Sequence, residues 1–120
     1  MPIATELRFD RAARVLHVAF DDASRFDLPA EYLRVESPSA EVQGHGPDQR
    51  TIVPGRRHVS ITAIEPVGNY AVRLTFDDLH DTGIYSWDYL HELGREQDER
   101  WTRYLNELAA RGLSRDPPPR

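Results

Sequence analysis

The amino-acid sequence predicts an α+β fold, in which an antiparallel β-sheet of about four to six strands is packed on one face by C-terminal helices. Apolar and polar residues alternate in several segments before residue 77, as they do in half-buried strands. After residue 86 the apolar residues instead recur at helical spacing. A chain of 120 residues suits one compact core. We therefore expect one domain over residues 1–113, followed by a disordered, proline-rich tail over residues 114–120.

The N-terminal third predicts a β-hairpin followed by a short helix. Alternation over residues 7–9 stops at a polar turn at residues 10–11 and resumes over residues 15–20. Residues 29–35 then predict a brief helix, because Pro29 is tolerated in the first turn of a helix.

The middle of the chain predicts a long loop and then a second hairpin. Residues 37–55 contain three prolines and three glycines with little periodicity, so we expect mostly loop, with a short edge strand around residues 41–43. Residues 59–64 and 70–76 show the clearest alternation in the chain. The segment between them, residues 66–69, contains Gly and Asn, which readily form turns, so an antiparallel pair is expected.

Two helices are predicted after this hairpin. Ser86 is placed to cap a short helix that stops at Gly94. Residues 95–111 predict a second helix with one apolar and one charged face. The apolar face consists of Trp101, Tyr104, Leu105 and Leu108.

Composition excludes several classes of function. The formal net charge of −5 opposes binding to the phosphate backbone, so no nucleic acid partner is expected. No segment is long and apolar enough for a membrane span, and we expect a cytoplasmic protein. The chain has no cysteine and no lysine, which removes thiolate metal sites, thiol nucleophiles, Schiff-base chemistry and the lysine of phosphate-binding loops. No histidine is followed two residues later by Asp or Glu, as in many non-heme iron sites.

Two segments carry most of the distinctive residues. The first is LRVESPSAEVQGHGPDQ, residues 33–49, and the second is IEPVGNYAVRLTFDDLHDTGIYSWDYL, residues 64–90. Together they resemble the gamma-butyrobetaine hydroxylase-like N-terminal domain family, also called DUF971, over roughly residues 5–94. That family includes small stand-alone bacterial proteins, N-terminal domains of certain 2-oxoglutarate-dependent hydroxylases, and domains attached to iron–sulfur cluster carrier ATPases. The resemblance implies an accessory domain, and the activity of the fused enzymes is not implied for the domain itself.

In the hydroxylase branch of this family, the resemblance implies a zinc module with three cysteines and one later histidine. The corresponding positions here are Ser37, Ser39, Val42 and His80. Because no thiolate is present, a Cys₃His zinc site is excluded and we expect no tightly held zinc. A weakly bound divalent metal with oxygen and nitrogen ligands remains open, with His80 and Asp78 as candidate ligands.

The same acidic segment has a purely structural alternative. Asp side chains commonly bond to nearby backbone in turns, and His80 could pack between elements. The triplet at residues 81–83 matches that of aspartic proteases, but its context favours a turn with Gly83 at positive φ.

Candidate partner-binding residues are Tyr85, Trp87 and His45. Tyr85 and Trp87 straddle a helix start and are not required by the core periodicity, which already accounts for Tyr70. His45 lies between two glycines that would allow close approach by a partner. A basic group for an anion is also possible; it comprises Arg50, Arg56 and Arg57.

The preferred interpretation is a non-catalytic accessory domain that binds a protein partner or forms a homo-oligomer. The alternative is a metal-binding protein linked to iron or iron–sulfur metabolism, with His80 as its best ligand. A third hypothesis, a free-standing hydrolase, is disfavoured because the sequence shows no recognisable nucleophile–base pair.

Overall fold

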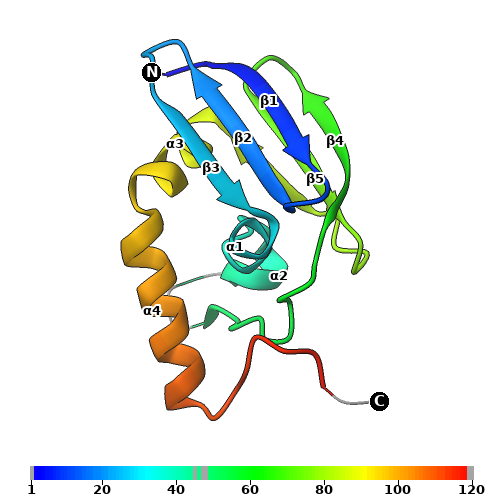
Figure 1. The fold of residues 1–120 in the computed structure, drawn as a ribbon, viewed down its shortest axis with the longest axis vertical. Helices are drawn as coiled ribbons and strands as arrows, with labels where there is room; N and C mark the ends of the chain where they lie inside the picture. Colours follow the sequence, from blue (N-terminus) through cyan, green and yellow to red (C-terminus); the bar gives the residue numbers. More distant parts are fainter. Residues whose placement is uncertain (1, 45, 47–48, 119–120) are drawn as a thin grey trace.

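A computed structural model describes residues 2–44, 46 and 49–118, and it confirms the α+β class. The strands of the described chain form two three-stranded antiparallel sheets, ordered β1-β2-β3 and β4-β5-β6, instead of the single sheet that we expected (Figure 1). The helices of the described chain are α1 (Ala30–Val35), α2 (Ala40–Gln43), α3 (Trp87–Arg95) and α4 (Gln97–Ala110).

The first sheet contains the predicted N-terminal hairpin and one further strand. Its strands are β1 (Ala4–Asp10), β2 (Val15–Phe20) and β3 (Arg25–Pro29). In the register of β2 with β3, Leu16 lies opposite Leu28 and Val18 opposite Phe26. These apolar pairs place one face of the sheet toward the core.

The second sheet contains the other predicted hairpin and a short strand that the sequence did not indicate. Its strands are β4 (Ile61–Val67), β5 (Ala71–Phe76) and β6 (Gly83–Ser86). Gly83 begins β6 and does not adopt the predicted positive φ, which Leu79 adopts in the preceding turn at φ 73°. A Cβ at Gly83 would lie 2.7 Å from Oγ of Ser37, so glycine here permits close packing of β6 on the chain after α1.

The helices differ from the prediction in two places. Residues 40–43 form the single turn α2 instead of an edge strand, because Oγ of Ser39 accepts a hydrogen bond from the Glu41 N–H at 3.2 Å and starts a helix. Ser86 caps α3 as predicted, accepting from the Tyr89 N–H at 3.1 Å. However, α3 continues through Gly94 to Arg95.

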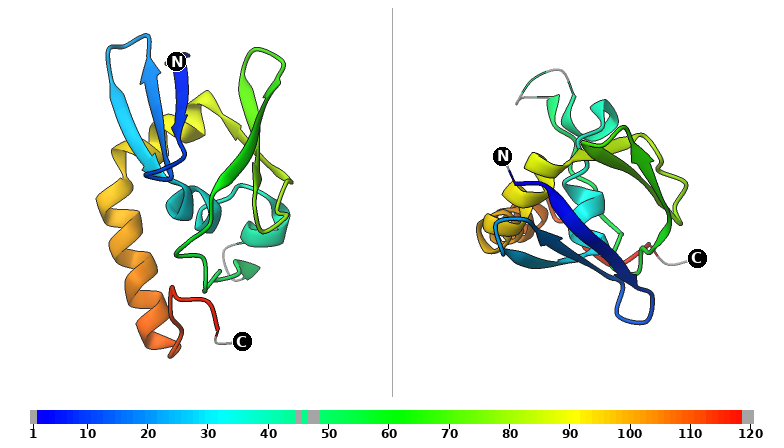
Figure 2. Two further views of the ribbon diagram at one scale, coloured as in Figure 1. Left: turned by 45° about the vertical axis from the view of Figure 1, so that its right-hand side comes forward. Right: turned by 90° about the horizontal axis from the view of Figure 1, so that it is seen from above.

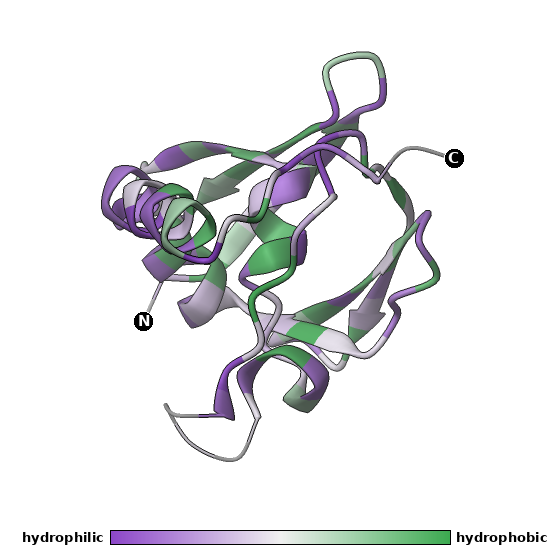
Figure 3. Ribbon diagram, turned by 90° about the horizontal axis from the view of Figure 1, so that it is seen from below, coloured by the Kyte–Doolittle hydropathy of each residue, from purple (hydrophilic) through white to green (hydrophobic). Residues whose placement is uncertain are grey.

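The two sheets share one apolar core, and α1 and α3 pack against it. Buried residues of both sheets and both helices form the cluster: Leu16, Val18, Phe20, Leu28, Tyr32, Leu33, Val72, Leu74, Phe76, Tyr85, Leu90 and Leu93. Figure 2 shows the two sheets facing each other, and Figure 3 shows α1 enclosed near the centre of the fold. The hydroxyl of Tyr32 donates to the Leu93 carbonyl at 2.7 Å, which joins α1 to α3. The helices therefore complete a shared core and do not cover one face of a single sheet.

The beginning of the C-terminal tail is held against the domain, whereas we expected disorder from residue 114. The carbonyls of Ser114 and Arg115 accept hydrogen bonds from the N–H groups of Gly55 and Arg57, each at 2.9 Å. Arg115 also donates two hydrogen bonds to the Glu31 carboxylate, at 2.7 and 2.8 Å. These paired contacts hold Ser114 and Arg115 against the domain. None of the helices in the described part of the chain combines the length and apolar character needed to cross a membrane.

Candidate functional site

The two segments that the sequence singled out lie side by side in the fold. Ser37, after α1, places its Oγ 2.9 Å from Nε2 of His80. Ser39 and Thr82 place their hydroxyl oxygens 2.7 Å apart. Contacts across more than 40 residues of sequence therefore join the loop between α1 and α2 to the chain that leads into β6.

His80 is buried at the centre of this junction. Its Nε2 faces the Ser37 hydroxyl and its Nδ1 lies 3.2 Å from the Glu41 carboxylate. Because a carboxylate only accepts, the hydrogen bonding assigns the ring proton to Nδ1, and the Ser37 hydroxyl donates to Nε2. Burial lowers the pKa of His80, as does the nearby Arg34 guanidinium, and the Glu41 carboxylate only partly opposes this. The imidazole is therefore neutral at pH 7.

The contacts of Ser37, His80 and Glu41 follow the order of a serine–histidine–carboxylate triad. Residue spacing did not indicate this arrangement, because Ser37 and His80 are 43 residues apart in the chain. Ser37 is nevertheless fully buried, and its Oγ also accepts the Ser39 N–H at 3.2 Å. A substrate carbonyl has no access to a hydroxyl in that position, so the arrangement acts as a structural link.

Asp78 is held by two guanidinium groups. Its Oδ2 accepts from Nε of Arg34 at 2.8 Å and from Nε of Arg56 at 2.6 Å, while Oδ1 accepts the His80 N–H at 3.2 Å. Partial burial alone would raise the pKa of Asp78, but these hydrogen bonds and the Arg34 charge bring it below its ordinary value. The described residues contain no group of three or more His, Asp or Glu side chains arranged for a metal ion. Metal binding by His80 and Asp78 stays a prediction, and it would require a cation to displace two arginines.

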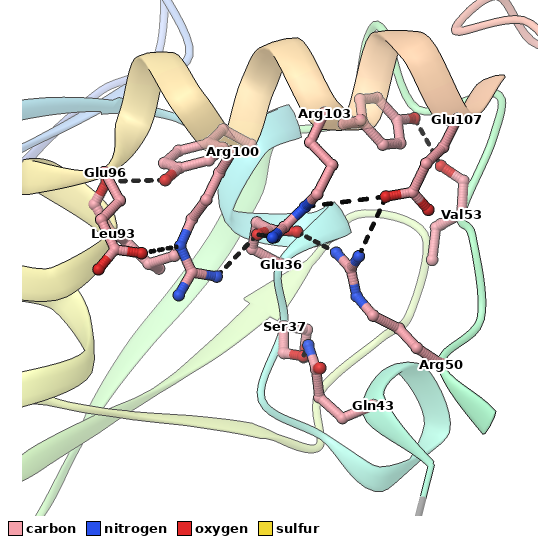
Figure 4. Close-up of polar contacts among 12 residues, drawn as sticks. Glu36, Ser37, Gln43, Arg50, Val53, Leu93, Glu96, Arg100, Arg103 and Glu107 are labelled. Carbon is pink, nitrogen blue, oxygen red and sulfur yellow. Dashed lines mark hydrogen bonds and ion pairs between the residues drawn. The ribbon is translucent and has the colours of Figure 1, made fainter. Parts of the chain in front are cut away.

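A second charged cluster, which the sequence did not indicate, surrounds Glu36 (Figure 4). The Glu36 side chain is 1% exposed. It pairs with Arg50, with Nη1 of Arg100 at 2.9 Å and with Nη2 of Arg103 at 3.5 Å. The tyrosine hydroxyl of Tyr89 donates to the Glu36 carbonyl. Glu36, which directly follows α1, is thus joined to α4 through its carboxylate and to α3 through its backbone carbonyl.

The three arginines considered as a basic group therefore have separate partners. Arg50 pairs with Glu36, Arg56 with Asp78, and Arg57 with Asp116. They do not converge on a common anion site.

An apolar groove of about 360 Å³ lies between the N-terminal residues and the start of α3. We name it the Trp87 groove; its lining residues are Pro2, Ile3, Asn69, Tyr70, Ser86, Trp87 and Asp88. Tyr70 is 58% exposed and Ile3 is 52% exposed. Trp87 is fixed at the groove by its Nε1, which donates to the Asn69 carbonyl at 2.9 Å. Exposed apolar side chains thus gather beside an anchored indole.

The predicted partner-binding residues differ in their placement. Trp87 lines the groove, whereas Tyr85 is fully buried and donates its hydroxyl proton to the Leu33 carbonyl at 2.5 Å. Tyr85 therefore offers no surface to a partner of the folded chain. His45 lies outside the described residues. Tyr70, which alternation assigned to the core, instead contributes exposed ring surface to the groove.

Comparison with known families identifies the family of the chain. The family model for the gamma-butyrobetaine hydroxylase-like N-terminal domain matches residues 7–91. The chain belongs to this family. No curated protein matches it.

Solved structures agree with this assignment of the DUF971 domain. Two solution structures determined by NMR share 45% and 49% sequence identity with the chain, with TM-scores of 0.84 and 0.85. They cover 100% and 98% of this chain, which in turn covers 94% and 87% of theirs. A crystal structure from Acidithiobacillus ferrooxidans ATCC 23270 shows a DUF971 protein of unknown function, with 41% identity and a TM-score of 0.64, covering 76% of this chain and 91% of its own.

The Ser37–His80 contact can be compared with the zinc module that the resemblance implies for other members of the DUF971 family. By the resemblance described under Sequence analysis, Ser37, Ser39, Val42 and His80 correspond to the positions expected to hold zinc in the hydroxylase branch. Here two serines reach the His80–Thr82 segment by hydrogen bonds, and Val42 is buried in a small apolar cluster with Val53. Hydroxyl contacts and apolar packing thus join the same segments of this chain.

We expect His80 to make the stability of this DUF971 domain depend on pH. Its folded-state pKa lies below the ordinary value of 6.5, so below about pH 6.5 the unfolded chain binds more protons than the folded chain. The free energy of unfolding should therefore fall as pH drops from 7.5 toward 5. Urea denaturation across this range should show a weaker dependence for His80→Gln than for wild type.

The exposed His58 supplies the matched control for this measurement. His58→Gln should retain the wild-type slope of unfolding free energy against pH. Equal slopes for wild type and His80→Gln would show that burial of His80 does not govern this dependence.

Proposed function

We propose that this chain is a non-catalytic interaction domain, which binds an apolar segment of a protein partner in the Trp87 groove. The carrying observation is the exposed apolar surface at Ile3 and Tyr70, which lies beside the anchored indole of Trp87. Aromatic residues in apolar pockets commonly supply much of the binding energy at protein interfaces.

The charge of the groove favours a basic partner segment. Asp88 is the charged side chain among the described residues that line it. Asp21 lies next to it, because its Oδ1 accepts the Ile3 N–H at 2.9 Å. The chain as a whole has a formal net charge of −5. An apolar partner residue flanked by Arg or Lys therefore complements this surface better than a second copy of the same acidic chain.

The proposal of a non-catalytic role rests on the burial of the one nucleophile–base contact described above. Ser37 is enclosed and His80 is held between two partners. The apolar lining of the Trp87 groove offers no such pair to a substrate. Binding is therefore the function that this geometry supports best.

Replacement of Trp87 with Ala should weaken partner binding by about 1.5–2 kcal/mol, because it removes the largest side chain that lines the groove. The probes are fluorescent peptides with a central Leu, Phe or Trp, flanked either by Arg or by Glu. We expect the Arg-flanked peptides to bind wild type and the Trp87→Ala variant to bind them at least about tenfold less tightly.

Further variants distinguish a loss of binding from a loss of folding. Tyr70→Ser alters an exposed groove residue and should also weaken binding, while Leu79→Ser alters an exposed apolar residue outside the groove and should not. Circular dichroism should show that all variants remain folded. Equal binding of Arg- and Glu-flanked peptides would contradict the proposed partner chemistry. A wild-type dimer in sedimentation experiments that dissociates on Trp87→Ala substitution would identify a second copy as the occupant instead.

A further inference from the structure

A second cavity, of about 260 Å³, lies on another part of the surface, and both charged and apolar residues line it. We name it the Arg34 pocket; its polar lining residues are Arg34, Glu41, Thr51, Arg56 and His80. The described residues that line it differ from those that line the Trp87 groove. Whatever it binds is therefore distinct from the occupant proposed for that groove.

Arg34, which lines this pocket, has a buried donor without a partner among the described residues. Its side chain is only 9% exposed, and Nε is bonded to Asp78. Its Nη1 is buried and has no hydrogen-bond partner among the described residues. A buried guanidinium nitrogen without a partner is uncommon in folded proteins, because desolvation of the N–H groups is then uncompensated. An acceptor from outside the chain would satisfy it.

If the Glu41 carboxylate is left out, the charged groups at the pocket have an excess of positive charge. Arg34 and Arg56 share the single carboxylate of Asp78, so these three groups together carry one net positive charge. Glu41 supplies a further carboxylate, with Oε2 3.2 Å from Nδ1 of His80. Its side chain is 65% exposed and belongs to the short helix α2, so it can turn outward into water at little cost.

We propose that the Arg34 pocket binds an anionic group, a carboxylate or a phosphate, which displaces the Glu41 side chain. The incoming oxygens accept hydrogen bonds from Nη1 of Arg34, from Arg56 and from the Nδ1–H of His80. Guanidinium groups suit such ligands because their N–H donors match the spacing of carboxylate and phosphate oxygens. Glu41 occupies the position of this ligand in its absence.

The experiment is an NMR titration of the full chain with inorganic phosphate at constant ionic strength, with acetate and a phosphoserine peptide in parallel. We expect saturable shifts of the His80 ring and of the Arg34 and Arg56 side-chain signals. Acetate binding would identify a carboxylate site, phosphate binding without acetate binding a phosphate site, and preference for the peptide a protein-borne phosphate. Linear shifts for all three probes would overturn the proposal.

Two variants with opposite expected effects make the test specific. Glu41→Gln removes the competing carboxylate and should tighten binding by about threefold or more, whereas Arg56→Gln removes a donor and should weaken it by about tenfold. The matched controls are Glu99→Gln and Arg57→Gln, which make the same charge changes on side chains outside the pocket. If Glu41→Gln and Glu99→Gln raise affinity equally, the ions respond only to overall charge and the proposed displacement is wrong. Arg34→Gln is avoided because the Arg34 side chain is only 9% exposed, whereas that of Arg56 is 34% exposed and its replacement disturbs the core less.

Discussion

Glu36→Gln should lower the free energy of unfolding by about 3–5 kcal/mol, the range typical when one partner of a buried ion pair is removed. The Glu36 carboxylate is almost fully enclosed and pairs with Arg50, Arg100 and Arg103. A neutral amide of the same shape leaves these guanidinium groups without their shared negative charge. Urea denaturation with a two-state fit measures the loss.

Glu107 provides a matched control within the same cluster. It contacts Arg50 at 3.5 Å and Arg103 at 3.8 Å, but its side chain is more exposed than that of Glu36. Glu107→Gln should therefore cost less than about 1 kcal/mol. Equal losses for the two variants would show that burial does not set the strength of this cluster.

A double-mutant cycle tests whether Glu36 acts through Arg100 in particular. Arg100 also pairs with Glu92 at 2.7 Å and with Glu96 at 3.0 Å, so it links α1 to both C-terminal helices. If the Glu36–Arg100 pair is strongly coupled, Glu36→Gln combined with Arg100→Met should cost less than the two single losses added together. Additive losses would assign the effect of Glu36→Gln to its other two partners.

The secondary structure was predictable where the pattern is local. Alternation located β2, β4 and β5, and Ser86 marked the start of α3, because both signals depend on residues close in sequence. The four-residue strand β6 was missed because it is too short to show a clear period. Because β6 was not predicted, Tyr85 was expected at the surface. Within β6, however, Gly83 and Tyr85 face inward while Ile84 faces solvent.

The charged clusters were not predictable because their partners are distant in the sequence. Glu36 follows a short helix in a position where an acidic residue is usually exposed. Its partners Arg50 and Arg100 lie 14 and 64 residues further along the chain. The Ser37–His80 contact was approached only through family resemblance, which relates those positions, and no periodicity connects them. The arrangement of strands into two sheets likewise depends on contacts between elements and not on local pattern.

Gly94 is structurally important, but not because it ends a helix. The sequence rule assigns Gly94 to the end of a helix, but the residue lies inside α3 beside Phe26 of β3. A Cβ at this position would lie 2.6 Å from Cδ1 of Phe26 and still closer to Cγ. The Phe26 ring is itself packed against Phe20 and His91, with ring centroids 6.0 and 5.5 Å away.

Gly94→Ala should therefore lower the free energy of unfolding by about 2–3 kcal/mol, because overpacking outweighs the gain of about 1 kcal/mol in helix propensity. Thermal or urea denaturation measures the change. Asn106→Ala, at an exposed position inside α4, is the control and should leave stability unchanged or slightly raised. In a Phe26→Ala background, where the ring is absent, Gly94→Ala should no longer destabilise. A stabilising effect of Gly94→Ala in the wild-type background would mean that α3 does not approach β3 as closely as the fold requires, and the packing of α3 on the first sheet would have to be revised.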